Sequence, residues 1–263
     1  MTDVLGTLGA GWAACALVFA ALWFRQRSTR DATVVDVAWA AGLGGLALLH
    51  GVFGEGALER RVLVALLAGA ASFRLAWYLW TDRGRKREED GRYRALRERW
   101  GDSAQRNFFW FFQAQAFLDV LLSIPFALAC SRPGPLDAWD FAALALGVAA
   151  ILGETAADRQ LARFRSDPRH RGRTCREGLW RFSRHPNYFF QWLLWCAYAL
   201  LALPAYLGWI GALAPALMLF LILRVTGIPP TEERALLSRG DDYRDYQRTT
   251  SAFVPWFQKK RYA

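Results

Sequence analysis

The chain of 263 residues is 54% hydrophobic, with 33 basic and 23 acidic side chains and a formal net charge of +10. The basic residues are divided among several loops and the C-terminal tail and form no nucleic-acid-binding motif, so we expect no nucleic-acid partner. The four cysteines form no CxxC pair, and this pattern predicts neither a disulfide framework nor a metal site.

Seven apolar stretches are long enough to cross a membrane as helices, which requires roughly 20 residues each. In chain order they are Leu5–Phe24, Val34–Phe53, Val62–Trp80, Phe108–Cys130, Trp139–Ala157, Tyr188–Leu203 and Tyr206–Val225. The sixth stretch is short and is followed by Pro204, so it could pair with the seventh as a tight helical hairpin. We therefore predict an all-α integral membrane protein with about seven transmembrane helices.

The basic residues alternate between the loops. The loops after spans one, three and five carry 3, 9 and 9 basic residues, whereas those after spans two, four and six carry 2, 1 and 0. Because Lys and Arg concentrate in cytoplasmic loops, the N-terminus is expected outside and the C-terminus in the cytoplasm. We expect one integral membrane domain over residues 1–263, with loops 81–107 and 158–187 and the tail 227–263 forming a cytoplasmic cap.

The segment Arg83–Trp100 lies before the fourth span. Its second half has the period of a helix, with Tyr93, Leu96 and Trp100 on one face. We interpret this helix as amphipathic and lying on the lipid headgroups, with contact to a cofactor as the alternative.

The other two cytoplasmic segments have clear stop signals. The loop 158–184 contains Pro168 and two glycines, so it cannot be one helix. In the tail, Gly227-Ile-Pro-Pro should end the seventh span. Residues Glu232–Ser238 are expected to be helical and to end at Gly240.

Five charged side chains fall within the predicted spans, where each costs about 2.5–3.5 kcal/mol at the bilayer centre. They are Asp36, Arg74, Asp119, Glu154 and Arg224. Such residues usually face the bundle interior or a wet cavity, and ion pairing or snorkelling near a span end is the alternative. Asp36, Arg74, Tyr78, Asp158 and Asn187 should all lie toward the cytoplasmic side, which predicts a polar site there.

A basic hexapeptide, Ser-Arg-His-Pro-Asn-Tyr at residues 183–188, opens the sixth apolar stretch. The free N–H groups of a helix N-terminus suit an anion, and a guanidinium group binds phosphate in a bidentate fork. We expect Asn187 to contact the anion, while His185 could act as a base, contact a phosphate or cap the turn. The placement favours an enzyme that holds a phosphate-bearing ligand at the membrane surface and acts on a lipid.

An ordered set of motifs extends from about Asp31 to Trp256. It comprises Val35-Asp36-Val-Ala-Trp39, Glu89-Asp90-Gly-Arg92-Tyr93, Gly153-Glu154-Thr-Ala-Ala-Asp158-Arg-Gln160-Leu, Gly178-Leu-Trp180, Ser183-Arg-His-Pro-Asn187-Tyr and Tyr243-Arg-Asp-Tyr246-Gln-Arg248…Phe253-Val-Pro255. This set resembles the bacterial branch of the steroid 5-alpha-reductase-like superfamily. The resemblance implies a seven-helix membrane reductase that binds NADPH from the cytoplasmic side and takes a lipid substrate from the bilayer. A bacterial inner membrane is accordingly expected.

The resemblance also indicates where the cofactor would bind. The candidates come from the fifth loop, the hexapeptide, the following helix and the tail: Asp158, Arg165, Arg173, Arg184, His185, Asn187, Gln191, Tyr243 and Arg248. Phe190 and Gln191 stand where the family usually has Gly and Glu, but Gln191 can still hydrogen-bond a hydroxyl group.

Reduction of an enone-type double bond requires a hydride donor over one carbon and an acid near the carbonyl oxygen. The family's Gln-Glu pair near the substrate ketone is absent from this chain. By position, Tyr78 is the expected proton or hydrogen-bond donor and Asp36 the group that orients it. The alternative for Tyr78 is an aromatic side chain facing the headgroups.

Two other functions compete with the reductase. A methyltransferase of the isoprenylcysteine carboxyl methyltransferase type would use S-adenosylmethionine, and it shares the Arg-His-Pro-x-Tyr turn, a Glu232-Glu233 pair and a Tyr-x-x-Tyr tail. A small transporter would show a polar stripe and inverted repeats, and the sequence has neither. The seven spans, the Glu-x-x-x-Asp motif and Asn187 favour the reductase. Sterol, polyprenol-like lipid and unsaturated fatty acyl chain are all possible substrates.

Overall fold

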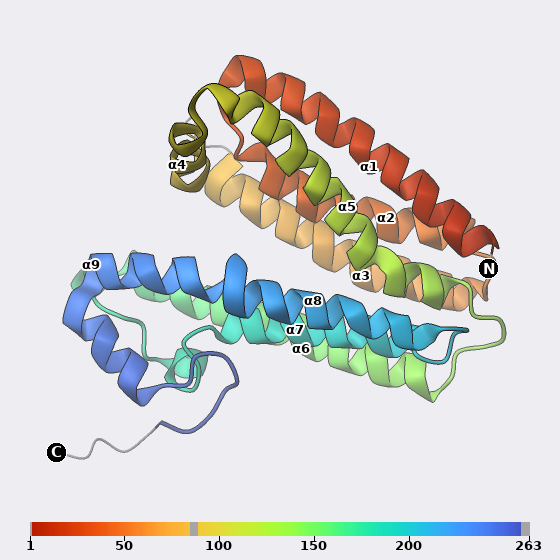
Figure 1. Cartoon of the computed structure of the whole chain (residues 1–263). Helices are drawn as coiled ribbons and strands as arrows, with labels where there is room; N and C mark the ends of the chain where they lie inside the picture. Colours follow the sequence, from red (N-terminus) through yellow and green to blue (C-terminus); the bar gives the residue numbers. More distant parts are fainter. Residues whose placement is uncertain (1, 85–88, 259–263) are drawn as a thin grey trace. The chain divides into compact units, whose positions relative to one another are not determined.

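The computed structural model describes residues 2–84 and 89–258, and helix is the only regular secondary structure of these residues (Figure 1). Helices make up 82% of the structure, which confirms the all-α prediction. The chain divides into two compact units. One comprises Met1–Phe141 and Leu200–Ala214, and the other comprises Ala142–Ala199 and Pro215–Ala263.

Six helical segments of the described residues are long and apolar enough to cross a membrane, which indicates an integral membrane protein. They are Val4–Thr29, Val34–Phe53, Leu58–Asp82, Gly91–Cys130, Ala138–Ser166 and Gly208–Thr249. The expected sixth span, Tyr188–Leu203, forms a helix of 17 residues, which is shorter than the roughly 20 that cross a hydrocarbon core. The count of seven spans and the orientation of the termini therefore stay predictions.

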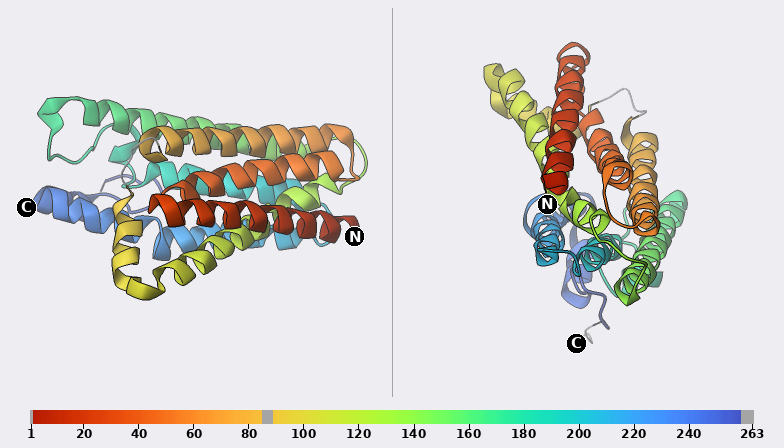
Figure 2. Two further views of the ribbon diagram at one scale, coloured as in Figure 1. Left: turned by 90° about the horizontal axis from the view of Figure 1, so that it is seen from above. Right: turned by 90° about the vertical axis from the view of Figure 1, so that its right-hand side faces the viewer.

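Long helices form the first unit: α1 (Thr2–Thr29), α2 (Val34–Phe53), α3 (Leu58–Leu79) and α5 (Ala104–Cys130). The shorter elements of this unit are the π-turn Trp80–Gly84, α4 (Gly91–Trp100) and the 3-10 turns Gly101–Ser103 and Gly208–Ala212. α2 packs mainly against α3 and α5, and α1 packs against α5. Figure 2 shows α1, α2 and α3 running along one another.

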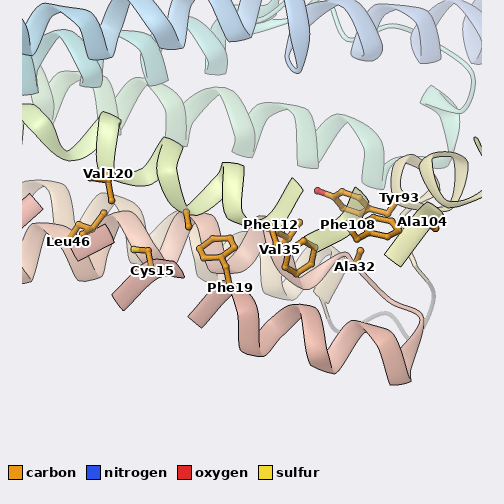
Figure 3. Packing of buried hydrophobic residues seen from close by; sticks show 11 residues of the cluster. Cys15, Phe19, Ala32, Val35, Leu46, Tyr93, Ala104, Phe108, Phe112 and Val120 are labelled. Atoms are coloured by element: carbon orange, nitrogen blue, oxygen red, sulfur yellow. The ribbon is translucent and has the colours of Figure 1, made fainter. Parts of the chain in front are cut away.

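A stripe of α5 forms the centre of the first unit (Figure 3). Phe108, Phe112, Ala116 and Val120 are four residues apart, so they lie on one helix face, and all four are buried. Phe19 of α1 meets Phe112 edge to face, with 6.4 Å between the ring centroids. Because lipid tails are as apolar as these rings, close packing rather than exclusion from water holds the helices together.

Helix α4 packs against this same core. Tyr93 is buried, and Leu96 and Trp100 are partly buried against the cluster. Trp100 meets Phe108 edge to face at 4.9 Å. The interpretation that the stripe of Tyr93, Leu96 and Trp100 faces lipid headgroups is therefore wrong, because the stripe belongs to the protein interior.

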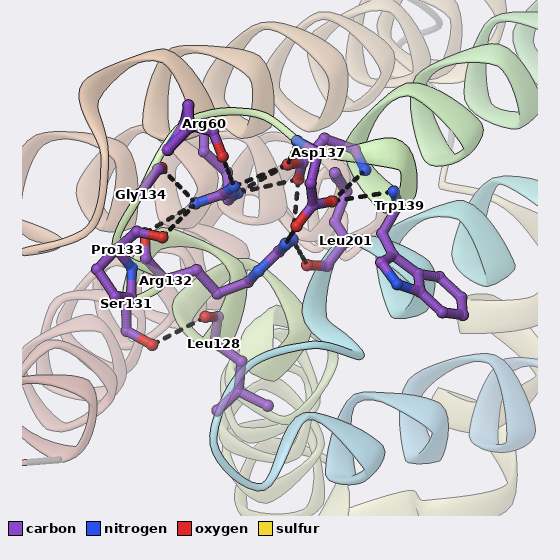
Figure 4. A network of polar contacts seen from close by, with 11 residues as sticks. Arg60, Leu128, Ser131, Arg132, Pro133, Gly134, Asp137, Trp139 and Leu201 are labelled. Atoms are coloured by element: carbon purple, nitrogen blue, oxygen red, sulfur yellow. Dashed lines mark hydrogen bonds and ion pairs between the residues drawn. The ribbon is translucent and has the colours of Figure 1, made fainter.

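A buried ion-pair network joins α3 to the first turn of α6 (Ala138–Ser166) and to the segment before it (Figure 4). Arg60 Nη2 lies 2.8 Å from Asp140 Oδ2, and these side chains are 1% and 0% exposed. Arg132 Nη1 donates to Asp140 at 2.9 Å and to the carbonyl of Leu201 at 2.8 Å. From the sequence, Arg60 and Arg132 were counted only as basic residues of the loops after spans two and four. Their charges in fact fix the loop that follows α5, since a buried charge is stable only when it is paired and hydrogen-bonded.

The second unit contains most of α6, of α7 (Pro186–Ala202) and of α8 (Leu213–Phe220). It also contains the π-turn Leu221–Val225 and α9 (Ile228–Thr249). The 3-10 turns Pro168–His170 and Gly178–Arg181 lie between α6 and α7.

The limits of two helices in the second unit, α6 and α9, affect where the predicted site residues lie. α6 continues to Ser166, so Asp158 is a helical residue and not the first residue of a loop. α9 begins at Ile228, before the predicted start at Glu232, and it continues past the predicted end at Gly240 to Thr249, with a break at Gly240, where φ is 51°. A side chain at that φ would be strained, so glycine allows the two halves of α9 to change direction.

Gly153 of α6 makes room for Phe190 of α7. A Cβ added at residue 153 would lie 2.4 Å from ring atoms of Phe190. The bulky ring of Phe190 is thus matched by a glycine on the neighbouring helix.

Candidate functional site

Four side chains converge on the carboxylate of Glu232, which is the fifth residue of α9. Arg184 Nε and Gln247 Nε2 donate to its two oxygens, each at 2.7 Å. His185 Nε2 and the Tyr243 hydroxyl each lie 3.2 Å from Oε1. These five residues are called the Glu232 cluster. With this many donors, the carboxylate is fixed in one orientation.

The chain after α9 holds the hexapeptide in place. The backbone N–H of Arg184 donates to the carbonyl of Ser251 at 2.8 Å, and Ser183 Oγ donates to the carbonyl of Phe253 at 2.8 Å. Arg184 Nη1 also donates to the carbonyl of Thr250 at 2.7 Å. Ser183 Oγ in turn accepts from the N–H of His185 at 3.1 Å. The residues before α7 are therefore pre-organised by backbone and side-chain hydrogen bonds.

Asp158 and Asn187 meet between α6 and α7. Asn187 Nδ2 donates to Asp158 Oδ1 at 3.1 Å, and Asn187 Oδ1 accepts from the N–H of Tyr188 at 3.0 Å. Both residues were predicted from the sequence to bind the cofactor. The structure brings them together at the N-terminus of α7.

The rest of the α6 motif supports the loop that leads to this site. Gln160 Oε1 accepts from the N–H of Leu179 at 2.9 Å, and Trp180 Nε1 donates to the carbonyl of Ala157 at 2.9 Å. Gly178 has a φ of 55° and leaves no space for a Cβ beside the Gln160 amide. Gln160, Gly178 and Trp180 are therefore positioning residues.

The other predicted cofactor residues are more exposed. The side chains of Arg165, Arg173 and Arg248 are exposed, and Gln191 is half-buried on α7. The structure thus groups Arg184, His185 and Tyr243 in the Glu232 cluster and pairs Asp158 with Asn187.

Sequence reasoning missed several polar residues of this unit. Gln247 was not a predicted site residue, and Glu232 was named only as part of the Glu232-Glu233 pair of the methyltransferase alternative. Arg176 donates to Asp245 at 2.8 Å and to Asp242 at 3.1 Å, which attaches the loop to α9. No local pattern indicates these pairs, because their members are more than 60 positions apart.

The two predicted catalytic residues lie in the first unit. Asp36, in the first turn of α2, accepts from Arg92 Nη2 at 2.5 Å and from the hydroxyl of Tyr93. Asp90 caps α4 by accepting from the N–H of Arg92 at 2.9 Å. Tyr78 lies in the last turn of α3 and is 45% exposed. The expected pairing of Asp36 with Tyr78 stays a prediction. The sequence did not predict that the hydroxyl of Tyr93 donates a hydrogen bond to Asp36.

His185 is buried beside Tyr188, with the two rings stacked at 5.4 Å. Burial lowers the pKa of His185, and the hydrogen bond to Glu232 opposes this shift only in part. The imidazole is therefore neutral at pH 7. If Nε2 carries the proton toward Glu232, Nδ1 is an acceptor.

The long apolar helices indicate an integral membrane protein, and polar side chains gather at the starts of α7 and α9 in its second unit. The family model described as protein of unknown function DUF1295 matches residues 22–250, and the chain belongs to this family, which is of the steroid 5-alpha-reductase-like type. No curated protein and no solved structure matches the chain significantly.

Proposed function

We propose that the protein is a membrane-embedded, NADPH-dependent reductase of a carbon–carbon double bond in a lipid substrate. The observation that carries the proposal is the hydrogen bond between Asn187 and Asp158, two residues 29 positions apart that were expected to hold the cofactor. Membership of a family of the steroid 5-alpha-reductase-like type supports it. We place the protein in a bacterial inner membrane, with the cofactor entering from the cytoplasm.

The residues present suit a dinucleotide. Arg165, Arg173 and Arg248 present exposed guanidinium groups, which can bind phosphate. Asn187 and Gln191 are one turn apart on α7, so their amides can both reach ribose hydroxyl groups.

In this mechanism NADPH, when bound, supplies a hydride to one carbon of the double bond. Tyr78 donates a proton or a hydrogen bond at the carbonyl oxygen of the substrate, where negative charge develops. Asp36 orients the donor. The apolar helices exclude water from the reaction, and the lipid enters laterally from the bilayer.

A second candidate is an S-adenosylmethionine-dependent lipid or isoprenylcysteine-type methyltransferase. The observation that favours it is the Glu232 cluster, in which Arg184 and His185 of the hexapeptide hold the first glutamate of the Glu232-Glu233 pair. These are the residues that the chain shares with such methyltransferases.

Ligand-induced thermal stabilisation in mild detergent separates the two functions. NADPH, NADH and S-adenosylmethionine are tested side by side, and a ligand at 100 times its Kd should stabilise the protein by about 2.7 kcal/mol. We expect stabilisation by NADPH that is lost in Asn187→Ala and retained in Arg244→Gln. Arg244 is a suitable control because it is exposed on α9 and pairs with Asp241 at 2.7 Å.

Stabilisation by S-adenosylmethionine alone would replace the reductase with the methyltransferase. If none of the three ligands stabilises the wild-type protein, both proposals fail.

A further inference from the structure

The chain after α9 ends in an aromatic stretch that is fixed to the second unit. Phe253 is buried, and its ring lies against Trp192 of α7, with 5.9 Å between the ring centroids. The backbone N–H of Trp256 donates to the carbonyl of Phe182, just before α7, at 2.9 Å. Residues 253–257, called the aromatic segment, are therefore held beside the start of α7.

The far end of the aromatic segment is exposed. Trp256 is 69% and Phe257 is 78% exposed, although both follow the buried Phe253 within four residues. Because α7 is apolar over most of its length, its start lies near the surface of the membrane. Tryptophan is enriched at that depth, where its ring contacts acyl chains and its N–H contacts headgroups. The exposed rings thus suit the membrane–water interface.

Basic side chains lie next to the aromatic segment. Arg181 is exposed and directly precedes Phe182, whose ring meets that of Phe257 edge to face at 6.2 Å. Three further basic residues follow in the sequence: Lys259, Lys260 and Arg261. They are within four residues of Phe257, which is at most about 14 Å along the chain. Residues 250–263 include no Asp or Glu, so the charge of this part of the sequence is purely positive.

We propose that the aromatic segment is a docking surface for anionic phospholipid headgroups. Trp256 and Phe257 insert at the boundary between headgroups and acyl chains, and the basic residues beside them attract the lipid phosphates. Binding of this kind grows with both the apolar area inserted and the charge of the leaflet. The aromatic segment also holds the hexapeptide, since Ser183 Oγ donates to the carbonyl of Phe253 at 2.8 Å. Docking therefore fixes the residues before α7 against the bilayer.

The test measures the depth of a nitroxide label on Gln258→Cys in the full chain. The protein is placed in nanodiscs of phosphatidylcholine, with or without phosphatidylglycerol. Collisions of the label with oxygen, which dissolves in lipid, are compared with collisions with a water-soluble nickel chelate. Arg169→Cys, at a position where the side chain is 87% exposed, gives the value for a label in water. Wild-type protein treated with the label gives the background from the native cysteines.

With phosphatidylglycerol, the label at residue 258 should be shielded from the chelate and accessible to oxygen. Each basic residue near an anionic surface should raise the ratio of docked to undocked segment about fivefold, so Arg181→Gln should lower it about fivefold. Replacing Lys259, Lys260 and Arg261 together by glutamine should lower it roughly 100-fold. Phe257→Ser should lower it about 10-fold by removing inserted apolar area.

The control is Arg244→Gln, which should leave the ratio unchanged because Asp241 already balances that charge at 2.7 Å. Melting temperatures close to wild type show that a variant has lost docking and not its fold.

Two results would overturn the proposal. In the first, the label at residue 258 is as accessible to the chelate as the label at residue 169 in both lipid mixtures. In the second, shielding is equal with and without phosphatidylglycerol, which would mean that the aromatic segment packs on protein or on neutral lipid. No cofactor takes part in this experiment, so its outcome is independent of the proposed reductase.

Discussion

Replacing Glu232 by glutamine tests whether the Glu232 cluster fixes the end of the second unit. The amide keeps the shape of the side chain, but it removes the negative charge and replaces one of the two acceptor oxygens with an NH₂ group. The charge-assisted bonds from Arg184 and Gln247 would therefore be weakened or lost. Arg184 and Glu232 are 11% and 14% exposed, so little solvent can replace those bonds.

The expected loss of unfolding free energy is about 2–4 kcal/mol, since hydrogen bonds to charged groups contribute roughly 1.5–3 kcal/mol each and broken buried pairs cost up to about 5 kcal/mol. Urea unfolding in mild detergent measures it. Glu233→Gln makes the same chemical change at the adjacent, exposed position and should stay within about 0.5 kcal/mol of wild type. Equal stabilities for the two variants would show that the converging donors do not stabilise this unit.

Three further perturbations test the packing and the charges. Gly153→Ala should destabilise by about 1–3 kcal/mol in urea unfolding, because its Cβ meets Phe190, and the added cost should vanish in a Phe190→Ala background. Asp140→Asn should cost about 3–5 kcal/mol in the same assay by unpairing buried arginines, whereas the exposed Glu59→Gln should have little effect. His185 has a pKa lowered in the folded state, so wild-type melting temperature should fall as pH drops below about 6.5, and His185→Gln should reduce that dependence.

The direction of the pH effect follows from proton uptake. A histidine kept neutral by burial binds its proton only after unfolding, so acid favours the unfolded chain. The stabilising contribution of His185 is present above its unfolded pKa and is lost as pH falls through the lower, folded pKa. A melting temperature that rises on acidification would contradict this reasoning.

Much of the secondary structure follows from local patterns in the sequence. The stretch Val34–Phe53 forms a helix with the predicted limits, since it is mostly apolar and ends before Gly54. Gly227-Ile-Pro-Pro separates the seventh span from α9, because proline lacks the N–H that a continuous helix requires. Asp158 is the exception. The sequence placed it at the start of a loop, but α6 continues past it with polar residues.

The periodicity of α4 shows where local pattern becomes ambiguous. Tyr93, Leu96 and Trp100 give the same stripe whether a helix faces lipid headgroups or a protein core. Only the neighbouring helix decides between them. Here α5 presents Phe108 to Trp100, and the core covers the stripe.

The sequence by itself determined that the chain is a helical membrane protein and that polar residues gather at the start of α7. Apolar length and the residue types of the hexapeptide are local properties, and each can be read along the chain. The tertiary structure alone decided the partners. Arg184 meets Glu232 across 48 positions, and Arg60 meets Asp140 across 80. Such pairs depend on which helices are neighbours and how each is rotated, and this geometry is set by the packing of whole helices rather than by any local pattern.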